Sequence, residues 1–235
     1  MTSSQIRVIC FPPAGGAARI FDVWRDHFPN WTEVIAVEYP GRGTRAQEGA
    51  VPDVEALAEE LATRLSVETE GPFALLGLSM GALVAFDFAT RLTQRGRPPI
   101  HLFVCSCRNP RQQLRHKLHE MPEEEFVAAL RRRQGASRFT CDDIDLGRPE
   151  LDALRADVTA SEHYVAPSGA TLNCPLSVFA GMQDKLLTRR GLALWGLFTS
   201  GRFLCEQFPG GHFFFRDHLD GVTARITDEL LRGLK

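Results

Sequence analysis

The stretch from Phe73 to Phe86 constrains the fold more than any other part of the chain. It starts with the apolar run FALLGL, which is typical of a buried strand, and it ends in good helix formers at helical spacing. Between them lies the G-x-S-x-G sequence of residues 77–81. A strand, this turn and a helix together indicate a nucleophile elbow, in which a tight corner exposes the hydroxyl of Ser79.

The elbow pattern alone leaves an alternative open. G-x-S-x-G is a short motif, and a plain strand-to-helix turn whose serine caps the helix has the same residues. If the turn is an elbow, the N-terminus of the helix faces the hydroxyl, and the amide of Met80 is placed to donate to an oxyanion. The rest of the chain has to decide between the two interpretations.

Composition restricts the class of protein. A chain of 235 residues with 44% hydrophobic and 24% charged residues fits a single domain, 1–235, of an ordinary globular protein. A formal net charge of −2 and the lack of a large basic face argue against nucleic-acid binding. Sixteen phenylalanines against two tyrosines indicate a large apolar volume, in the core or in a pocket for an apolar ligand.

The sequence predicts a cytoplasmic protein with reduced thiols. The first five residues lack the features of a signal peptide, and no apolar run approaches the length of a membrane span. The six cysteines form no C-x-x-C pair, and most lie in apolar strand-like runs, so we expect buried thiols, neither disulfides nor a zinc site. We therefore expect no metal, no cofactor and no membrane partner.

Strand-like and helix-like segments alternate along most of the chain. Helices are expected at 20–28, 54–65, after the elbow, at 192–198 and at 222–234, and strands at 6–11, 33–39, 73–78, 100–107, 176–180 and 202–208. This alternation predicts an α/β fold with a mostly parallel central sheet and helices on both faces.

The alternation stops between about residues 108 and 169. Helices are expected at 113–118, 123–133 and 151–164, with a loop-like stretch between the last two and no convincing strand. Because this is too long for an ordinary crossover, we interpret it as a helical lid inserted into the sheet. Apolar residues of the segment are expected to line a substrate chamber beneath it: Phe126, Leu130, Phe139, Leu154 and Tyr164. The alternative is an insertion that only adds core.

The first strand ends in a loop suited to a close backbone approach. Pro12-Pro13-Ala14-Gly15-Gly16 cannot be the interior of a helix, and its glycines allow other backbone to come near. A hydrolase built on an elbow needs a second oxyanion donor from the loop after an early strand. The amide of Ala14 is the candidate, although a simple Pro/Gly turn has the same composition.

Three side chains follow predicted strands in the order Ser79, Asp184, His212. This is the nucleophile, acid, histidine order of α/β hydrolases, and the carboxyl ends of parallel strands share one sheet edge. A serine needs a base to take its proton, histidine titrates in the right range, and a carboxylate would hold the imidazole tautomer. We expect activity to fall on acidification, as His212 becomes protonated.

Other histidines and acids fit these roles less well. Four histidines lie in helix-like sequence and are expected to be ordinary surface or core residues: His27, His116, His119 and His218. His163 lies near the end of a lid helix, where it is placed to touch substrate. The loop Arg108-Asn109-Pro110 carries no carboxylate, which favours Asp184 as the acid.

The motifs together resemble those of a known family. FPPAGGAA, YPGRGTR, GLSMG, MPEEEFVAALRR, LRADVTASEHY, CPLSVFAGMQD and FPGGHFFF occur in this order along nearly the whole chain. In this the chain is similar to the stand-alone type II thioesterases of polyketide and nonribosomal peptide synthesis. The resemblance implies an α/β-hydrolase fold and a catalytic triad of Ser79, Asp184 and His212, with the amides of Met80 and Ala14 as oxyanion hole.

The resemblance also implies a substrate and a partner. Such enzymes hydrolyse acyl groups held as thioesters on the phosphopantetheine arm of carrier domains, either to clear stalled units or to release products. Leu78 departs from the family, which usually has histidine there, and we expect it to change the rate or the polarity of the chamber. An acyltransferase or cyclase, and a docking protein without turnover, remain alternatives that product analysis and a fluorophosphonate probe would separate.

Arginines near the lid are candidates for meeting the partner. A carrier domain is commonly acidic, and the candidate cations are Arg111, Arg115, Lys117 and Arg131-Arg132-Arg133. A solvated helix face explains the arginine run equally simply. We expect the protein to act as a monomer.

Overall fold

The computed structural model describes residues 5–114, 117–134 and 148–233. Its centre is a six-stranded sheet in the order β2-β1-β3-β4-β5-β6, and every neighbouring pair is parallel. The strands are β1 (Ile6–Phe11), β2 (Thr32–Ala36), β3 (Phe73–Leu78), β4 (His101–Cys105), β5 (Leu176–Gly181) and β6 (Phe203–Phe208). The prediction of a parallel α/β sheet is confirmed.

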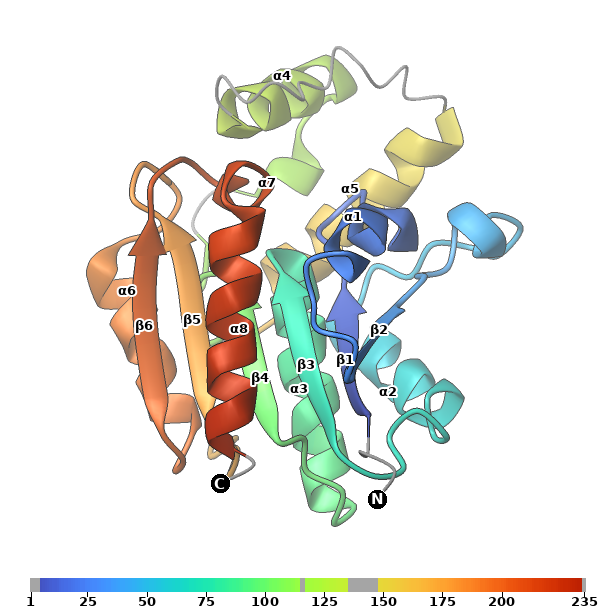
Figure 1. The fold of residues 1–235 in the computed structure, drawn as a ribbon. Helices are drawn as coiled ribbons and strands as arrows, with labels where there is room; N and C mark the ends of the chain where they lie inside the picture. Colours follow the sequence, from blue (N-terminus) through green and yellow to red (C-terminus); the bar gives the residue numbers. More distant parts are fainter. Residues whose placement is uncertain (1–4, 115–116, 135–147, 234–235) are drawn as a thin grey trace.

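Helices cover both faces of the sheet (Figure 1). One face packs against η1 (Ala18–Phe21), α1 (Asp22–Arg25), α7 (Phe214–Asp217) and α8 (Leu219–Gly233). The other packs against α2 (Val54–Arg64), α3 (Met80–Gln94), α6 (Arg189–Ala193) and η5 (Leu194–Phe198). Alternate residues of β1 point to the two sides, so Val8 and Cys10 join one core while Ile9 and Phe11 join the other.

Local sequence explains where several elements begin and end. The carboxylate of Asp53 accepts a hydrogen bond of 2.8 Å from the amide of Ala56 and so caps α2. Strand β4 stops at Cys105, two residues before the predicted end, because Ser106 has a φ of +52° and cannot continue an extended strand. The helix expected at 20–28 is instead a turn of 3₁₀ helix followed by a single α-helical turn.

The segment between β4 and β5 lies over the carboxyl ends of the strands (Figure 1). It contains η3 (Leu118–Glu120), α4 (Glu123–Gln134) and α5 (Arg148–His163), and its described part has no strand. The helix predicted at 113–118 is wrong: Gln113 and Leu114 are not helical, and the 3₁₀ turn starts only at Leu118. A small apolar cluster, separate from the two sheet cores, joins η3, α4 and α5.

Candidate active site

The turn after β3 has the geometry of a nucleophile elbow. Ser79 has φ and ψ of 52° and −118°, and α3 begins at the next residue. A Cβ at Gly77 would lie 2.3 Å from the Cα of Ala82, and a Cβ at Gly81 would lie 2.2 Å from the carbonyl oxygen of Phe11. Both positions therefore require glycine, because no side chain fits between the backbone segments that meet there.

The imidazole of His212 lies over the hydroxyl of Ser79. It follows β6 and a Pro-Gly-Gly turn, and its Nε2 is 3.1 Å from the Oγ of Ser79. The turn comes close to the end of β5, where a Cβ at Gly181 would lie 2.1 Å from the carbonyl oxygen of Gly211. This backbone contact between the end of β5 and the turn after β6 therefore sets the position of the His212 ring relative to Ser79.

A carboxylate holds the other side of the ring. Asp184 lies three residues past β5, and its Oδ2 is 2.7 Å from the Nδ1 of His212. Its Oδ1 accepts a hydrogen bond of 2.9 Å from the amide of Leu186, and its side chain is almost fully buried. A buried carboxylate in this position favours the tautomer with the proton on Nδ1, which leaves Nε2 free to accept a proton from the hydroxyl.

Ser106 contacts the loop that carries His212, and the sequence did not predict this contact. Its hydroxyl donates a hydrogen bond of 2.5 Å to the carbonyl oxygen of His212, and its positive φ turns the side chain toward that loop. Neither a motif nor hydrophobic periodicity identifies such a contact, since the two residues are 106 positions apart. In the sequence, Ser106 was only the end of an apolar strand.

Two backbone amides border the same space. Ala14 and Met80 line a cavity together with Ser79 and His212, and the close contact of Gly81 with Phe11 brings their loops together. Within the described residues, neither amide donates a hydrogen bond to another group. Both are thus available to a ligand oxygen over the hydroxyl.

The loop that carries Ala14 is tied to helix α5. The amide of Gly15 donates to Oδ2 of Asp157 at 2.7 Å, and Arg42 contacts both oxygens of the same carboxylate, with Nη2 at 2.8 Å from Oδ1. Burial raises the pKa of Asp157, while Arg42 and the Gly15 amide act in the opposite direction. The sequence predicted no role for this pair, although both residues lie in its motifs, YPGRGTR and LRADVTASEHY.

The cavity has a volume of about 190 Å³ and extends from Ser79 under the helical segment. Leu130 and Leu154 line it as predicted, whereas Phe126 does not: its ring lies in the apolar cluster of the segment, under Arg155 at 4.2 Å. The prediction for Tyr164 is also wrong, because its hydroxyl donates to Asp87 at 3.1 Å within the main core. Phe139 lies outside the described residues.

Two other residues that the sequence analysis singled out, His163 and Leu78, do not line the cavity. His163 packs against the ring of His119 and does not line the cavity, so no substrate contact is seen for it. Leu78 is fully buried in the core on the α8 side of the sheet and does not line the cavity either. The expected change in chamber polarity is therefore wrong, while an effect on rate stays a prediction.

In the described residues, neither metal-ligating groups nor cysteines form a second candidate site. Among these residues, no group of three or more histidine, cysteine, aspartate or glutamate side chains is arranged to hold a metal ion. The five cysteines in this part of the chain are free, and burial raises the pKa of the Cys107 thiol, beside the cavity, to about 12. No helix in the described ranges combines the length and apolar character that a bilayer crossing requires.

The parallel sheet, the elbow and the strand-end constellation define an α/β hydrolase. The model of the thioesterase domain family matches residues 6–230. The chain therefore belongs to the thioesterase domain family, whose members act as hydrolases on thioesters.

Curated relatives agree with the family match. The chain is 36% identical over 228 residues to a probable cadicidin biosynthesis thioesterase of Streptomyces griseus, an alignment that covers 97% of this chain and 63% of that protein. It is 35% identical over 231 residues to thioesterase PikA5 of Streptomyces venezuelae, covering 97% of this chain and 82% of the relative. The chain thus spans slightly less than two thirds of the length of the first relative.

Solved structures have the same fold. The type II thioesterase BorB from the borrelidin biosynthetic cluster superposes with a TM-score of 0.91 at 34% identity, over 97% of this chain and 93% of that one. RedJ, a thioesterase from the prodiginine pathway of Streptomyces coelicolor, gives 0.88 at 32% identity, over 96% and 86%. The resemblance to type II thioesterases is confirmed, and the α/β-hydrolase fold with it.

Proposed function

We propose that this enzyme hydrolyses acyl thioesters on the phosphopantetheine arm of carrier domains of a polyketide or nonribosomal peptide synthase. Ser79 is the nucleophile, His212 the general base and acid, and Asp184 the residue that orients the imidazole. The observation that carries the proposal is the unbroken chain from the Ser79 hydroxyl to His212 at 3.1 Å and on to Asp184 at 2.7 Å. The segment 108–169 acts as the lid over this site.

The first half of the reaction forms an acyl-enzyme. Nε2 of His212 takes the proton of Ser79 while Oγ attacks the thioester carbonyl carbon. The amides of Met80 and Ala14 stabilise the oxyanion, and a donor of this kind typically contributes about 2.7–4 kcal/mol to lowering the barrier. When the tetrahedral intermediate collapses, the C–S bond breaks, and the proton on Nε2 passes to the departing thiol of the arm.

The second half regenerates the serine. Water enters in place of the thiol, His212 removes its proton, and the oxygen attacks the ester carbonyl of the acyl-enzyme. Collapse then returns the proton from His212 to Ser79 and releases the free carboxylic acid. The enzyme itself requires no cofactor for these steps, because the phosphopantetheine belongs to the carrier domain.

The relatives and the thiols support the cellular setting that we propose. PikA5 and BorB are thioesterases, and BorB comes from a biosynthetic cluster, so a synthase is the natural source of substrate. Free cysteines suit a reducing compartment, and five are found in the described residues. We propose that the enzyme works in the cytoplasm as a monomer beside its synthase, without nucleic-acid or membrane partners.

Mass spectrometry of loaded carrier domains tests the proposal. Incubation with the enzyme is expected to remove the acyl mass from the arm and to yield a free acid, and Ser79→Ala is expected to abolish this without unfolding the protein. Ser66→Ala, at an exposed serine, is the matched control with unchanged activity. An ester or amide product would indicate acyl transfer instead, and failure of a fluorophosphonate to label Ser79 would contradict nucleophilic catalysis.

A further inference from the structure

An apolar surface lies beside the sheet edge at α6. Of the eight large hydrophobic side chains that are exposed in the described residues, four fall between residues 182 and 197: Met182, Leu186, Leu194 and Leu197. Leu197 is the most exposed of all eight, at 65%. Single exposed leucines need no explanation, but Leu194 and Leu197 line one groove and Leu186 lines the catalytic cavity, and exposed apolar side chains gathered at a groove mark a binding surface.

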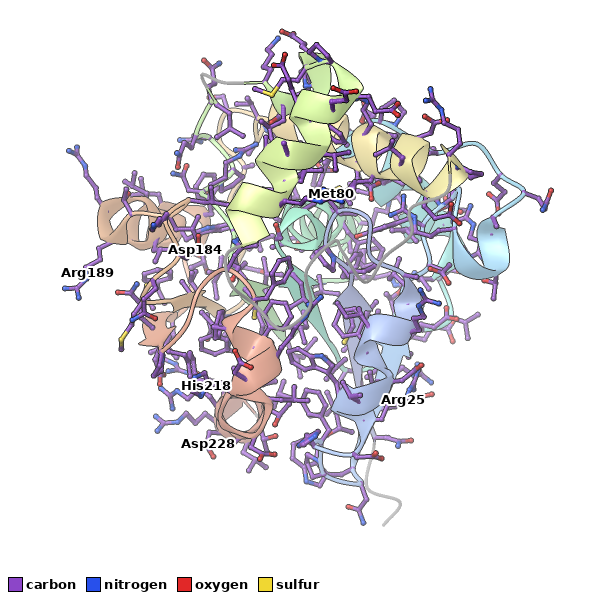
Figure 2. All side chains as sticks on the ribbon, turned by 90° about the horizontal axis from the view of Figure 1, so that it is seen from above. Arg25, Met80, Asp184, Arg189, His218 and Asp228 are labelled. Carbon is purple, nitrogen blue, oxygen red and sulfur yellow. The ribbon has the colours of Figure 1, made fainter. Side chains whose placement is uncertain are left out.

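The same surface carries positive charges without acidic partners. Arg111, Lys185, Arg189 and Arg190 are exposed, and within the described residues none of the four forms an ion pair. The guanidinium of Arg111 lies over the ring of Phe198 at 5.3 Å. In the view from above the sheet, the side chain of Arg189 points away from the protein body into solvent (Figure 2).

Acidic residues are missing from the chain around these cations. Between residues 182 and 202 the only acid is Asp184, which is buried and bound to His212. Several exposed arginines elsewhere do pair with acids, as Arg95 does with Glu59 and Arg148 with Glu123. Unpaired cations around exposed leucines are complementary to a partner that presents carboxylates around apolar side chains.

A groove on this surface adjoins the catalytic cavity. It has a volume of about 410 Å³, and its walls are residues 109–112 and 188–198. The cavity over Ser79 is lined by Arg108 and Leu187, the residues directly before these two walls. Arg108 fastens the first wall by donating to the carbonyl oxygens of Gln112 at 2.6 Å and Asn109 at 3.2 Å. The two chain segments that begin at Arg108 and Leu187 therefore border both the cavity and the groove.

We infer that the surface formed by residues 109–112 and 182–198 is the docking site of the carrier domain, which binds with an acidic, partly apolar face. This inference rests on the proposed function. A domain seated in the groove holds its arm beside the entrance to the cavity, so a thioester at the tip of the arm reaches Ser79. The exposed leucines contact the apolar centre of the partner and the arginines its acidic rim.

The location differs from the cationic region expected from the sequence. Of those residues, Arg111 belongs to the docking surface, but Lys117 is paired with Glu120 at 3.1 Å. Arg115 lies outside the described residues, and Arg131 is already engaged in an interaction. The side chains of Arg132 and Arg133 lie outside the described ones, so the docking surface keeps Arg111 from the expected set and adds the cations at α6.

Charge reversal tests the inference with two substrates. Arg189→Glu with Arg190→Glu is expected to raise KM for an acyl carrier domain about tenfold, with kcat and the hydrolysis of the same acyl group on N-acetylcysteamine unchanged. The charge control is Arg19→Glu with Arg64→Glu, which makes the same change of net charge at exposed positions elsewhere and also gives up the surface ion pair of Arg64 with Glu60. A second variant, Leu197→Gln, is expected to raise the same KM without altering the charge.

The outcomes separate the inference from the proposed function. An unchanged KM for the carrier substrate in the α6 variants would overturn the docking site, as would an equal effect of the control pair. Equal losses on the carrier and on the small thioester would also overturn it, because docking affects only the former. A dimer that dissociates on charge reversal would assign the surface to a second copy. If the wild-type enzyme hydrolyses the small thioester but no acyl carrier domain, the proposed function is contradicted, and not the docking site alone.

Discussion

The carboxylate of Asp157 in helix α5 accepts a hydrogen bond of 2.7 Å from the amide of Gly15, although 142 residues separate them. Arg42 neutralises the same carboxylate through both of its terminal nitrogens. Gly15 follows Ala14, whose amide we propose as an oxyanion donor. The position of the segment over the cavity and the shape of the oxyanion loop are therefore coupled through one buried side chain.

Asp157→Asn is expected to lower both stability and kcat. The amide keeps the shape and one acceptor oxygen for Gly15, but it leaves the guanidinium of Arg42 buried without a counter-charge. Breaking a buried pair in this way typically costs about 3–5 kcal/mol. Urea denaturation measures the free energy of unfolding, and steady-state hydrolysis of a small thioester measures kcat.

A double variant separates the two effects. Arg42→Met with Asp157→Leu removes both charges, so most of the stability should return, since replacement of a buried ion pair by apolar groups is often neutral. Leucine at 157 also removes the acceptor of the Gly15 amide, so kcat should stay low. Recovery of kcat together with stability would show that the carboxylate does not position the oxyanion loop.

Ser106→Ala is expected to lower kcat about tenfold while the free energy of unfolding falls by no more than about 1.5 kcal/mol, the net contribution of one ordinary hydrogen bond. The hydroxyl holds the backbone of His212 at 2.5 Å, and without it the imidazole samples positions away from Ser79. Ser106→Gly relieves the positive φ but also lacks the hydroxyl. If the glycine variant keeps wild-type kcat, backbone geometry and not the hydrogen bond determines the position of the ring.

Gly81→Ala is expected to abolish activity and to destabilise the fold. The new Cβ would lie 2.2 Å and 2.5 Å from the carbonyl oxygens of Phe11 and Pro12, so the elbow and the oxyanion loop must move apart. Overpacking of this kind typically costs about 1–3 kcal/mol or more. Gly49→Ala is the matched control, because its Cβ meets no atom within 4 Å. Activity of Gly81→Ala near wild type would contradict the close approach.

The strands of the sheet could be predicted because each is a short, mainly apolar run followed by a turn; β3, FALLGL, is apolar throughout, whereas β2 and β6 at the edges carry Glu33 and Glu206. Their carboxyl ends then placed Ser79, Asp184 and His212 on one edge by topology alone, and the structure brings these three side chains within hydrogen-bonding distance. Strand boundaries were less accurate where the backbone, and not the side chains, ends the element. Ser106 is an example, since its positive φ leaves no trace in hydrophobicity.

Contacts over long sequence separations could not be predicted. Arg42 and Asp157 are 115 residues apart, and each alone has the pattern of an ordinary surface charge. Helical periodicity also does not specify what a helix face packs against, which is why Phe126 and Tyr164 were assigned to the chamber. The structure places the first against helices of the same segment and the second against α3. Only the way in which α4 and α5 pack decides which of their side chains face the cavity.

The last prediction concerns stability in acid. His101 is buried in β4, stacks on Phe103 with ring centres 4.0 Å apart, and its Nε2 lies 2.9 Å from the Oγ of Ser177. Burial, with a smaller effect of Arg202, lowers the pKa of His101 to about 3. In the unfolded chain a histidine has a pKa of about 6.5. Between these values the unfolded chain binds a proton that the folded protein does not.

The folded state therefore loses stability as pH falls below 6.5, at about 1.4 kcal/mol per pH unit from this residue. Between pH 6.5 and pH 4.5 the loss is about 2 to 3 kcal/mol. His101→Gln keeps a polar group near Ser177 but does not titrate, so its stability should fall by that much less over the same interval. Urea denaturation of both proteins at the two pH values measures the difference, and equal losses in both would show that His101 is protonated in the fold.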